Sequence, residues 1–139
     1  MLLTKENITE IIPQQAPFVM VDNLVSADET GFKSTFKVEE NNLYLKDGKL
    51  QEPALIENIA QTVAAGFGFV DKQAGGKPKI GFIGGISKLN IHALPTLNKT
   101  IETTVTHLHQ FENIYLIKGE NFCDGELLVT CEMKIVVQE

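Results

Sequence analysis

The sequence predicts an α+β fold in which a curved antiparallel sheet of about six strands wraps around one long central helix. Two observations lead to this prediction. Residues 54–73 form one apolar stretch of helical length, and the segments on both sides have the composition and turn spacing of strands. The chain has 139 residues, of which 43% are hydrophobic, so we expect one domain that spans residues 1–139.

The first forty residues predict a short helix followed by a hairpin. Thr4 is a suitable N-cap, because its hydroxyl can accept a hydrogen bond from a free backbone N–H, and Pro13 stops the helix after residue 12. Residues 18–25 are mostly apolar and predict a buried strand, and residues 32–38 predict its partner. The turn sequence at residues 28–31 joins the two strands.

A long central helix is predicted after a polar loop. Residues 39–52 are polar and contain the turn sequence Asp47-Gly48. Pro53 suits the first helical turn, because its missing N–H would be unpaired there, and Gly75-Gly76 ends the helix. The apolar residues between these points occupy nearly every angle around the axis. They therefore predict a helix that is buried on most sides.

The remainder of the chain predicts four strands, at residues 79–91, 98–110, 113–121 and 126–138. Asp124-Gly125 is a strong hairpin turn sequence, and Gly84-Gly85 inside a strand predicts a bulge. One apolar helix among about six mostly antiparallel strands has few packing solutions. The simplest is the hotdog architecture, in which the sheet curves around the helix. The alternative is an α+β sandwich with the helix across one face.

The charge and the N-terminus exclude several classes of protein. Eighteen acidic and twelve basic residues give a net charge of −6, which argues against nucleic acid as a partner. The first ten residues contain Lys5, Glu6 and Glu10, so we expect no secretion signal. No apolar stretch is long enough to cross a membrane. We therefore expect a cytoplasmic protein that binds neither nucleic acid nor a membrane.

No metal site or cofactor is expected. His107 and His109 lie two residues apart, which predicts that they share one face of a strand as two metal ligands would. No third ligand lies near them in the sequence, so we expect two partly exposed histidines without a metal. His92 is expected in an exposed loop.

Residues 11–22 resemble the opening signature of the beta-hydroxyacyl-ACP dehydratases. In that family a proline-histidine pair precedes a Pro-Phe-hydrophobic-Asp run. Pro13, Pro17-Phe18 and Asp22 match this pattern, whereas Gln14 replaces the histidine.

Residues 54–61 resemble the central-helix motif of the same family, in which Ala-Gln follows an acidic residue after three positions. Glu57 and Ala60-Gln61 match it. The family's second histidine, which takes the α-proton of the acyl chain, precedes this helix, but residues 41–50 contain Leu43 and no histidine. This form looks more like the divergent dehydratase-like proteins of aryl polyene biosynthesis. The resemblance implies a hotdog fold and an acyl thioester substrate.

A dehydratase removes an α-proton and protonates a leaving hydroxyl, usually with a histidine base and a carboxylic acid in an apolar site. Glu57 is the candidate acid, because it shares one helix face with Gln61, and a polar pair on a buried helix needs partners or a cavity. Free N–H groups at the helix N-terminus would polarise the thioester carbonyl. The predicted catalytic residue is therefore Glu57, and the predicted substrate-binding residues are Gln14, Phe18, Pro53, Ala54 and Gln61.

Three functions fit these residues. The first, which the resemblance implies, is a (3R)-hydroxyacyl-[acyl-carrier-protein] dehydratase-like protein of fatty-acid or polyene biosynthesis, acting on thioesters of acyl carrier protein or coenzyme A. The second is a hotdog thioesterase in which Glu57 activates water. The third is a non-catalytic subunit that binds an acyl chain or a partner. The resemblance also implies a homodimer or higher homo-oligomer, with residues 80–91 as the edge strand.

Overall fold

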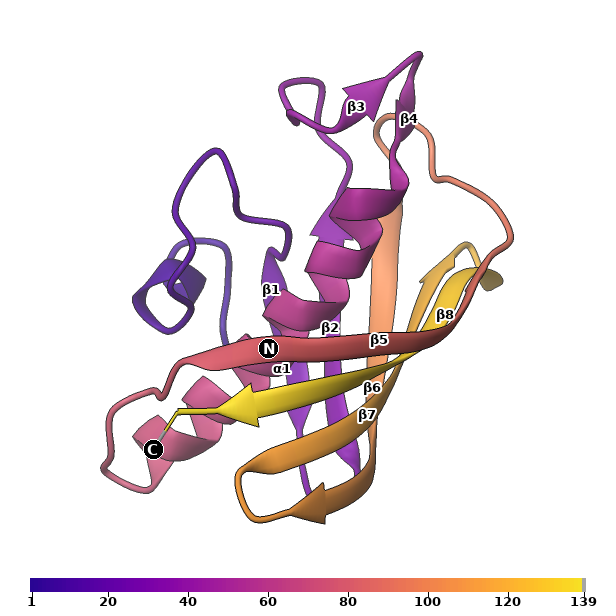
Figure 1. Cartoon of the computed structure of the whole chain (residues 1–139). Helices are drawn as coiled ribbons and strands as arrows, with labels where there is room; N and C mark the ends of the chain where they lie inside the picture. Colours follow the sequence, from indigo (N-terminus) through magenta and orange to yellow (C-terminus); the bar gives the residue numbers. More distant parts are fainter. Residues whose placement is uncertain (139) are drawn as a thin grey trace.

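A computed structural model describes residues 1–138 and contains one long helix and one large sheet. Figure 1 shows the sheet curving around the helix α1. The sheet is antiparallel, and its strand order is β1-β2-β6-β7-β8-β5. A separate hairpin, β3 with β4, lies before the helix. The elements in chain order are η1 (Ile8–Glu10), β1 (Asn23–Ala27), β2 (Gly31–Lys37), β3 (Leu45–Lys46), β4 (Lys49–Leu50), α1 (Glu52–Gln73), β5 (Gly81–Ile91), β6 (Thr100–Phe111), β7 (Ile114–Cys123) and β8 (Glu126–Val137).

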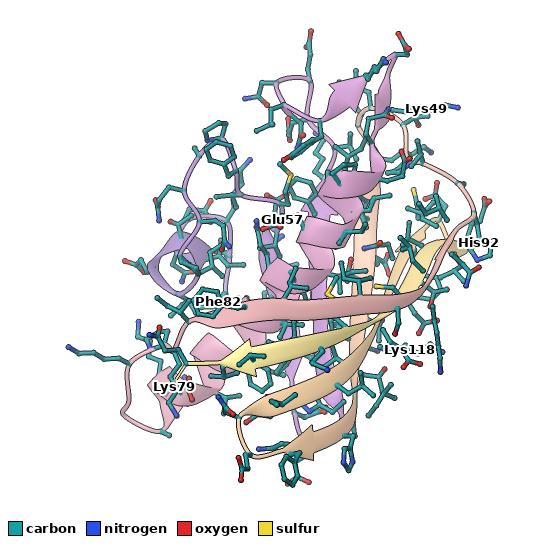
Figure 2. All side chains as sticks on the ribbon, in the orientation of Figure 1. Lys49, Glu57, Lys79, Phe82, His92 and Lys118 are labelled. Carbon is teal, nitrogen blue, oxygen red and sulfur yellow. The ribbon has the colours of Figure 1, made fainter. Side chains whose placement is uncertain are left out.

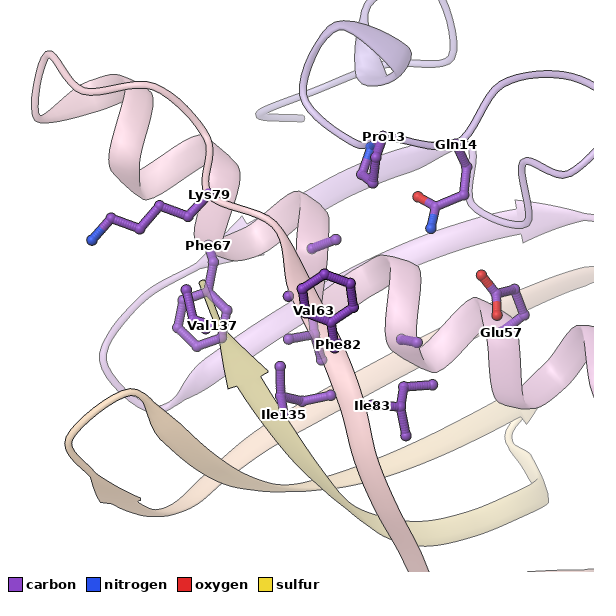
Figure 3. A pocket seen from close by; sticks show the side chains of 13 residues that line it. Pro13, Gln14, Glu57, Val63, Phe67, Lys79, Phe82, Ile83, Ile135 and Val137 are labelled. Carbon is purple, nitrogen blue, oxygen red and sulfur yellow. The ribbon is translucent and has the colours of Figure 1, made fainter. Parts of the chain in front are cut away.

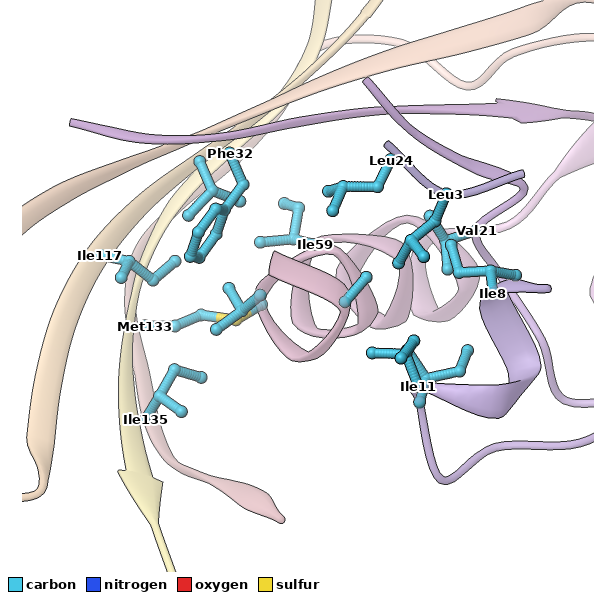
Figure 4. Close-up of a cluster of buried hydrophobic side chains, with 14 of the residues drawn as sticks. Leu3, Ile8, Ile11, Val21, Leu24, Phe32, Ile59, Ile117, Met133 and Ile135 are labelled. Carbon is cyan, nitrogen blue, oxygen red and sulfur yellow. The ribbon is translucent and has the colours of Figure 1, made fainter. Parts of the chain in front are cut away.

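The helix lies in the concave face of the sheet and builds two apolar clusters against it. The larger cluster surrounds Ile59 and Val63 in the middle of the helix and is shown in Figure 4. The smaller one surrounds Ala54 and Leu55 at the start of the helix. Both clusters join the helix to the sheet and to the N-terminal segment, as the wrapped arrangement requires. The hotdog prediction is therefore confirmed, and so is a helix that is buried on most sides.

Two predictions about the N-terminal segment are wrong. Residues 4–12 contain only the 3-10 turn η1, in which Thr4 accepts backbone hydrogen bonds through its carbonyl and makes no hydroxyl cap. The predicted strand at residues 18–25 begins only at Asn23. Its first part is apolar but pairs with no strand, because side chains of α1 hold the backbone of Phe18 and Met20 instead.

The predicted turns after residue 38 form as expected. Asp124 and Gly125 both have positive φ angles and join β7 to β8. Asp47 and Gly48 do the same between β3 and β4, where the sequence indicated only a turn within a loop. The register of β5 against β8 shifts between Ile83 and Gly85, which confirms the predicted bulge.

Two glycines allow the helix to approach the sheet closely. A Cβ at Gly119 of β7 would collide with the side chain of Ile59, and a Cβ at Gly66 of α1 would collide with the ring of Phe32. Ile59 and Phe32 belong to the larger core cluster. The separation of helix and sheet thus depends on these two positions having no side chain.

We expect Gly119→Ala to lower the free energy of unfolding by about 1–3 kcal/mol, because the added methyl overpacks the core beneath α1. Gly76→Ala is the matched control, since its Cβ would lie 3.4 Å from the nearest atom, in an exposed turn. The control is expected to change stability by less than about 0.5 kcal/mol. Denaturant unfolding measures both, and equal effects would contradict the close contact at Gly119.

Candidate functional site

A groove of about 250 Å³ runs between α1 and the edge of the sheet formed by β5 and β8. Figure 3 shows Glu57 and Gln14 at one end of this groove and Phe67 and Lys79 at the other. The middle is apolar, with small side chains on the helix. The lining residues are Pro13, Gln14, Glu57, Ala60, Val63, Ala64, Phe67, Lys79, Gly81, Phe82, Ile83, Ile135 and Val137.

Glu57 is a half-buried carboxylate whose position is fixed by Gln61. The two residues lie one turn apart on α1, and the Gln61 Nε2 donates a hydrogen bond of 2.9 Å to the Glu57 Oε1. The same amide also donates to the Phe18 carbonyl at 2.9 Å and accepts from the Met20 N–H at 2.6 Å. Gln61 is 1% exposed, so these bonds are protected from water. Gln61 therefore connects the Glu57 carboxylate to residues 18–20, which lie against the helix.

Asn58 anchors the same segment to the sheet. Its Nδ2 donates to the Met20 carbonyl at 2.6 Å, and its Oδ1 accepts hydrogen bonds from Thr103 of β6 and Asn121 of β7. All of these side chains are buried. Both polar atoms of the Asn58 amide are paired, although the Oδ1 of Asn121 has no partner among the described residues. Paired buried groups favour one arrangement, because displacement leaves them unpaired. Asn58 thus connects the segment around Met20 to the sheet, and Gln61 connects the same segment to the helix.

The structure brings together three of the predicted site residues and separates the other three. Gln14 and Glu57 line the groove, and Gln61 holds Glu57. Phe18 is 57% exposed and does not line the groove. Pro53 is exposed, and Ala54 is fully buried in the core with its N–H bonded to the Gln51 carbonyl. In this chain, then, the N–H of Ala54 is already paired.

Gln14 stands at the position of the family's first histidine and faces the groove. Its Oε1 is buried and has no hydrogen-bond partner among the described residues. A buried acceptor without a partner costs stability, so this oxygen is available to a donor on a ligand. Asp22, from the same motif, binds the backbone of β2 instead, because its Oδ2 accepts from the Lys37 N–H at 2.9 Å. Burial raises the pKa of the Asp22 carboxyl.

None of the three histidines lines the groove. The prediction that His107 and His109 share one face is wrong, because a bulge separates them in the pairing of β6 with β7. His107 lies opposite Ile117 and His109 opposite Leu116, and neighbouring residues of a strand point to opposite faces. His92 is exposed, as expected. The described residues contain no cluster of side chains able to hold a metal ion.

The strand β5 is exposed along its whole length, although it is rich in large apolar residues. Figure 2 marks its two ends by Phe82 and His92. It pairs with β8 on one side and with no described strand on the other. Its apolar side chains are 41–56% exposed, and Gly81, Phe82 and Ile83 also line the groove. An open edge of this kind is a template for pairing with another chain.

Comparison with known proteins identifies the family. The model of the ApeP-like family, described as ApeP dehydratase, matches residues 6–139. The chain belongs to the ApeP-like dehydratase family. The resemblance to dehydratases seen in the two sequence motifs is thereby confirmed. No curated protein is similar enough to this sequence to match it.

Solved structures confirm the hotdog fold of this ApeP-like chain. A chain of the dehydratase heterocomplex ApeI:P from Xenorhabdus doucetiae superposes with a TM-score of 0.87 at 20% identity, covering 95% of this chain and 91% of that one. A hypothetical thioesterase with coenzyme A from Streptococcus pneumoniae gives a TM-score of 0.68 at 13% identity, with 84% of each chain covered. The E. coli PaaI protein gives 0.64 at 13% identity, covering 82% and 81%. None of the described helices is long and apolar enough to cross a membrane.

Gln14 and Gln61 are expected to differ in their effect on stability. Gln61→Met keeps the length of the side chain but leaves the Met20 N–H and the Phe18 carbonyl unpaired, so it should lower the free energy of unfolding by about 2–4 kcal/mol. Gln14→Met removes a buried oxygen that has no partner, and should leave the free energy of unfolding unchanged or raise it. Urea denaturation of both variants measures the contrast. A Gln61→Met protein as stable as wild type would contradict the anchoring role of Gln61.

Proposed function

We propose that this chain binds a 3-hydroxyacyl thioester in the groove and supplies Glu57 as the acid of a dehydration, while a second hotdog subunit paired along β5 supplies the base. The observation that supports this most directly is the content of the groove. Its described lining contains one carboxylate, held by Gln61 beside apolar walls, and no histidine.

The environment of Glu57 suits an acid that protonates a leaving hydroxyl. Gln61 occupies Oε1, and no described residue donates to Oε2, so the proton of the acid form would reside on Oε2. The apolar lining from Ala60 to Ile83 would exclude water from the acyl chain. Gln14, which lines the same end of the groove as Glu57 and has an unpaired oxygen, would accept a hydrogen bond from the substrate, for instance from an amide N–H of the phosphopantetheine arm.

The reaction balances with one acid and one base. The base of the second subunit takes the α-proton, the β carbon–oxygen bond breaks, and the hydroxyl leaves as water with the proton of Glu57. The product is the enoyl thioester, and the proton held by the base returns through solvent to the Glu57 carboxylate. Because this chain offers no histidine in the groove, the α-proton needs an acceptor from outside it.

The open edge supports a second subunit as the source of that base. β5 forms one wall of the groove, and its free side leaves apolar residues in water. A second chain that pairs with β5 would cover these apolar residues, and its side chains would also lie next to the groove. A relative of this chain occurs in a dehydratase heterocomplex, ApeI:P. For an ApeP-like chain the corresponding partner is an ApeI-type subunit, and a second copy of this chain is the alternative.

The test is an assay of the chain alone and of the chain co-expressed with the ApeI-type subunit of its host. Each is incubated with a 3-hydroxyacyl thioester of acyl carrier protein, and enoyl absorbance and free thiol are followed together. We expect enoyl product from the complex only. In the complex, Glu57→Gln should lower kcat by about 10²–10⁴-fold with little change in KM, because the variant binds substrate but cannot donate the proton.

Glu52→Gln is the matched control, since it removes a carboxylate at the start of the same helix that does not line the groove. It should leave kcat unchanged. A fully active Glu57→Gln complex would refute Glu57 as the acid. Enoyl formation by the chain alone would refute the need for a second kind of subunit, and release of free thiol would instead identify a thioesterase.

A further inference from the structure

The groove has an aromatic wall at the end that lies farthest from Glu57. Phe67 closes the groove there, ten residues along α1, which corresponds to about 15 Å of helix. Between these two residues the helix presents Ala60, Val63 and Ala64, and the small side chains of the two alanines leave room for an extended chain. A thioester held at Glu57 would therefore direct its acyl chain toward Phe67.

The ring of Phe67 is held by aromatic neighbours on its other side. It stacks on His107 with centroids 5.6 Å apart and an interplanar angle of 8°, and it contacts Tyr115 at 4.6 Å. The edge of Phe32 completes this arrangement at 5.2 Å. Aromatic contacts of this kind stabilise a ring beyond the effect of its burial alone. They therefore hold the ring of Phe67 in place at this end of the groove.

A second cavity, of about 430 Å³ and open to the surface, also has Phe67 in its lining. Among the described residues, Phe67 alone lines both cavities. Figure 3 shows the ring at the far end of the groove from Glu57. Shortening this one side chain would join the two spaces. The lining of the second cavity is Glu29, Phe67, Val70, Asp71, His107, Leu108, His109, Gln110, Tyr115 and Leu116.

We infer that Phe67 determines the length of the acyl chain that this protein accepts, by separating the groove from the second cavity. The inference rests on the proposed function, because it takes the groove as the acyl site. Chains that end before Phe67 gain affinity with each carbon atom, and longer chains meet the ring. Ala64 lies one turn before Phe67, and its small side chain leaves space for the acyl chain to reach the ring of Phe67.

The experiment measures binding, by calorimetry, of S-alkyl thioethers of phosphopantetheine whose alkyl chains lengthen two carbons at a time. These probes carry the arm shared by acyl carrier protein and coenzyme A, and they can be neither dehydrated nor hydrolysed. For the wild type, affinity should rise about fourfold per methylene and then stop rising at one chain length. For Phe67→Ala, it should continue to rise beyond that length.

Two further variants make the result specific. Phe69→Ala truncates the same residue type on the same helix but lines neither cavity, so it should keep the wild-type limit. Ala64→Leu fills the groove before the wall and should shorten the limit, which keeps the test valid if Phe67→Ala does not fold. An unchanged limit in a folded Phe67→Ala protein would overturn the role of Phe67 while leaving the acyl site intact, and an unchanged limit in Ala64→Leu would overturn the path of the acyl chain toward Phe67. Absence of binding by wild type at any length would overturn the proposed function itself.

Discussion

The side-chain amide of Gln61 is the constraint on which the site depends. It holds two backbone groups of residues 18–20 and one oxygen of Glu57, and it is almost fully excluded from water. Asn58 extends the same anchoring to the sheet through Thr103 and Asn121. Because these bonds are buried or partly buried, breaking one leaves a polar group poorly paired, which favours a single arrangement of the helix, the N-terminal segment and the carboxylate.

This arrangement explains why the groove is well formed on one side and open on the other. The helix side is fixed by the polar anchors and by the close contact at Gly119, whereas the β5 side ends at a strand edge with exposed apolar residues. An edge of this composition is unfavourable in water. In the proposed mechanism, this edge is also where a second subunit contributes the base. That proposal links the stability of the isolated chain and the completeness of its site through β5.

Much of the fold follows from the sequence, because local patterns determine it. The helix after Pro53, the strand that became β2 and the turn at Asp124-Gly125 all form where composition and turn residues predict. The pairing of Glu57 with Gln61 also follows from their spacing on one helix face. The features that the sequence does not predict depend on contacts between segments that lie far apart in the chain. Residues 18–21 are apolar like a strand, but the backbone of Phe18 and Met20 binds helix side chains, and no local pattern reveals that.

Parts of the candidate site likewise could not be predicted, because they depend on contacts between distant segments. The bulge that separates His107 from His109 interrupts a regular alternation without a glycine to indicate it. The role of Phe67 depends on two cavities that meet at one side chain, which requires the packing of α1 against β6 and β7. By contrast, Gln14 and Glu57 were found from the family motifs, although the burial of the Gln14 oxygen beside the groove needed the structure.

The decisive measurement is a crystal structure of the assembled protein with a non-reactive 3-hydroxyacyl phosphopantetheine thioether. We expect the 3-hydroxyl to contact Oε2 of Glu57 while Gln61 still holds Oε1, and the acyl chain to lie along Ala60 and Ala64 toward Phe67. A ligand bound elsewhere on the chain, or a Glu57 carboxylate turned away from the hydroxyl, would contradict it.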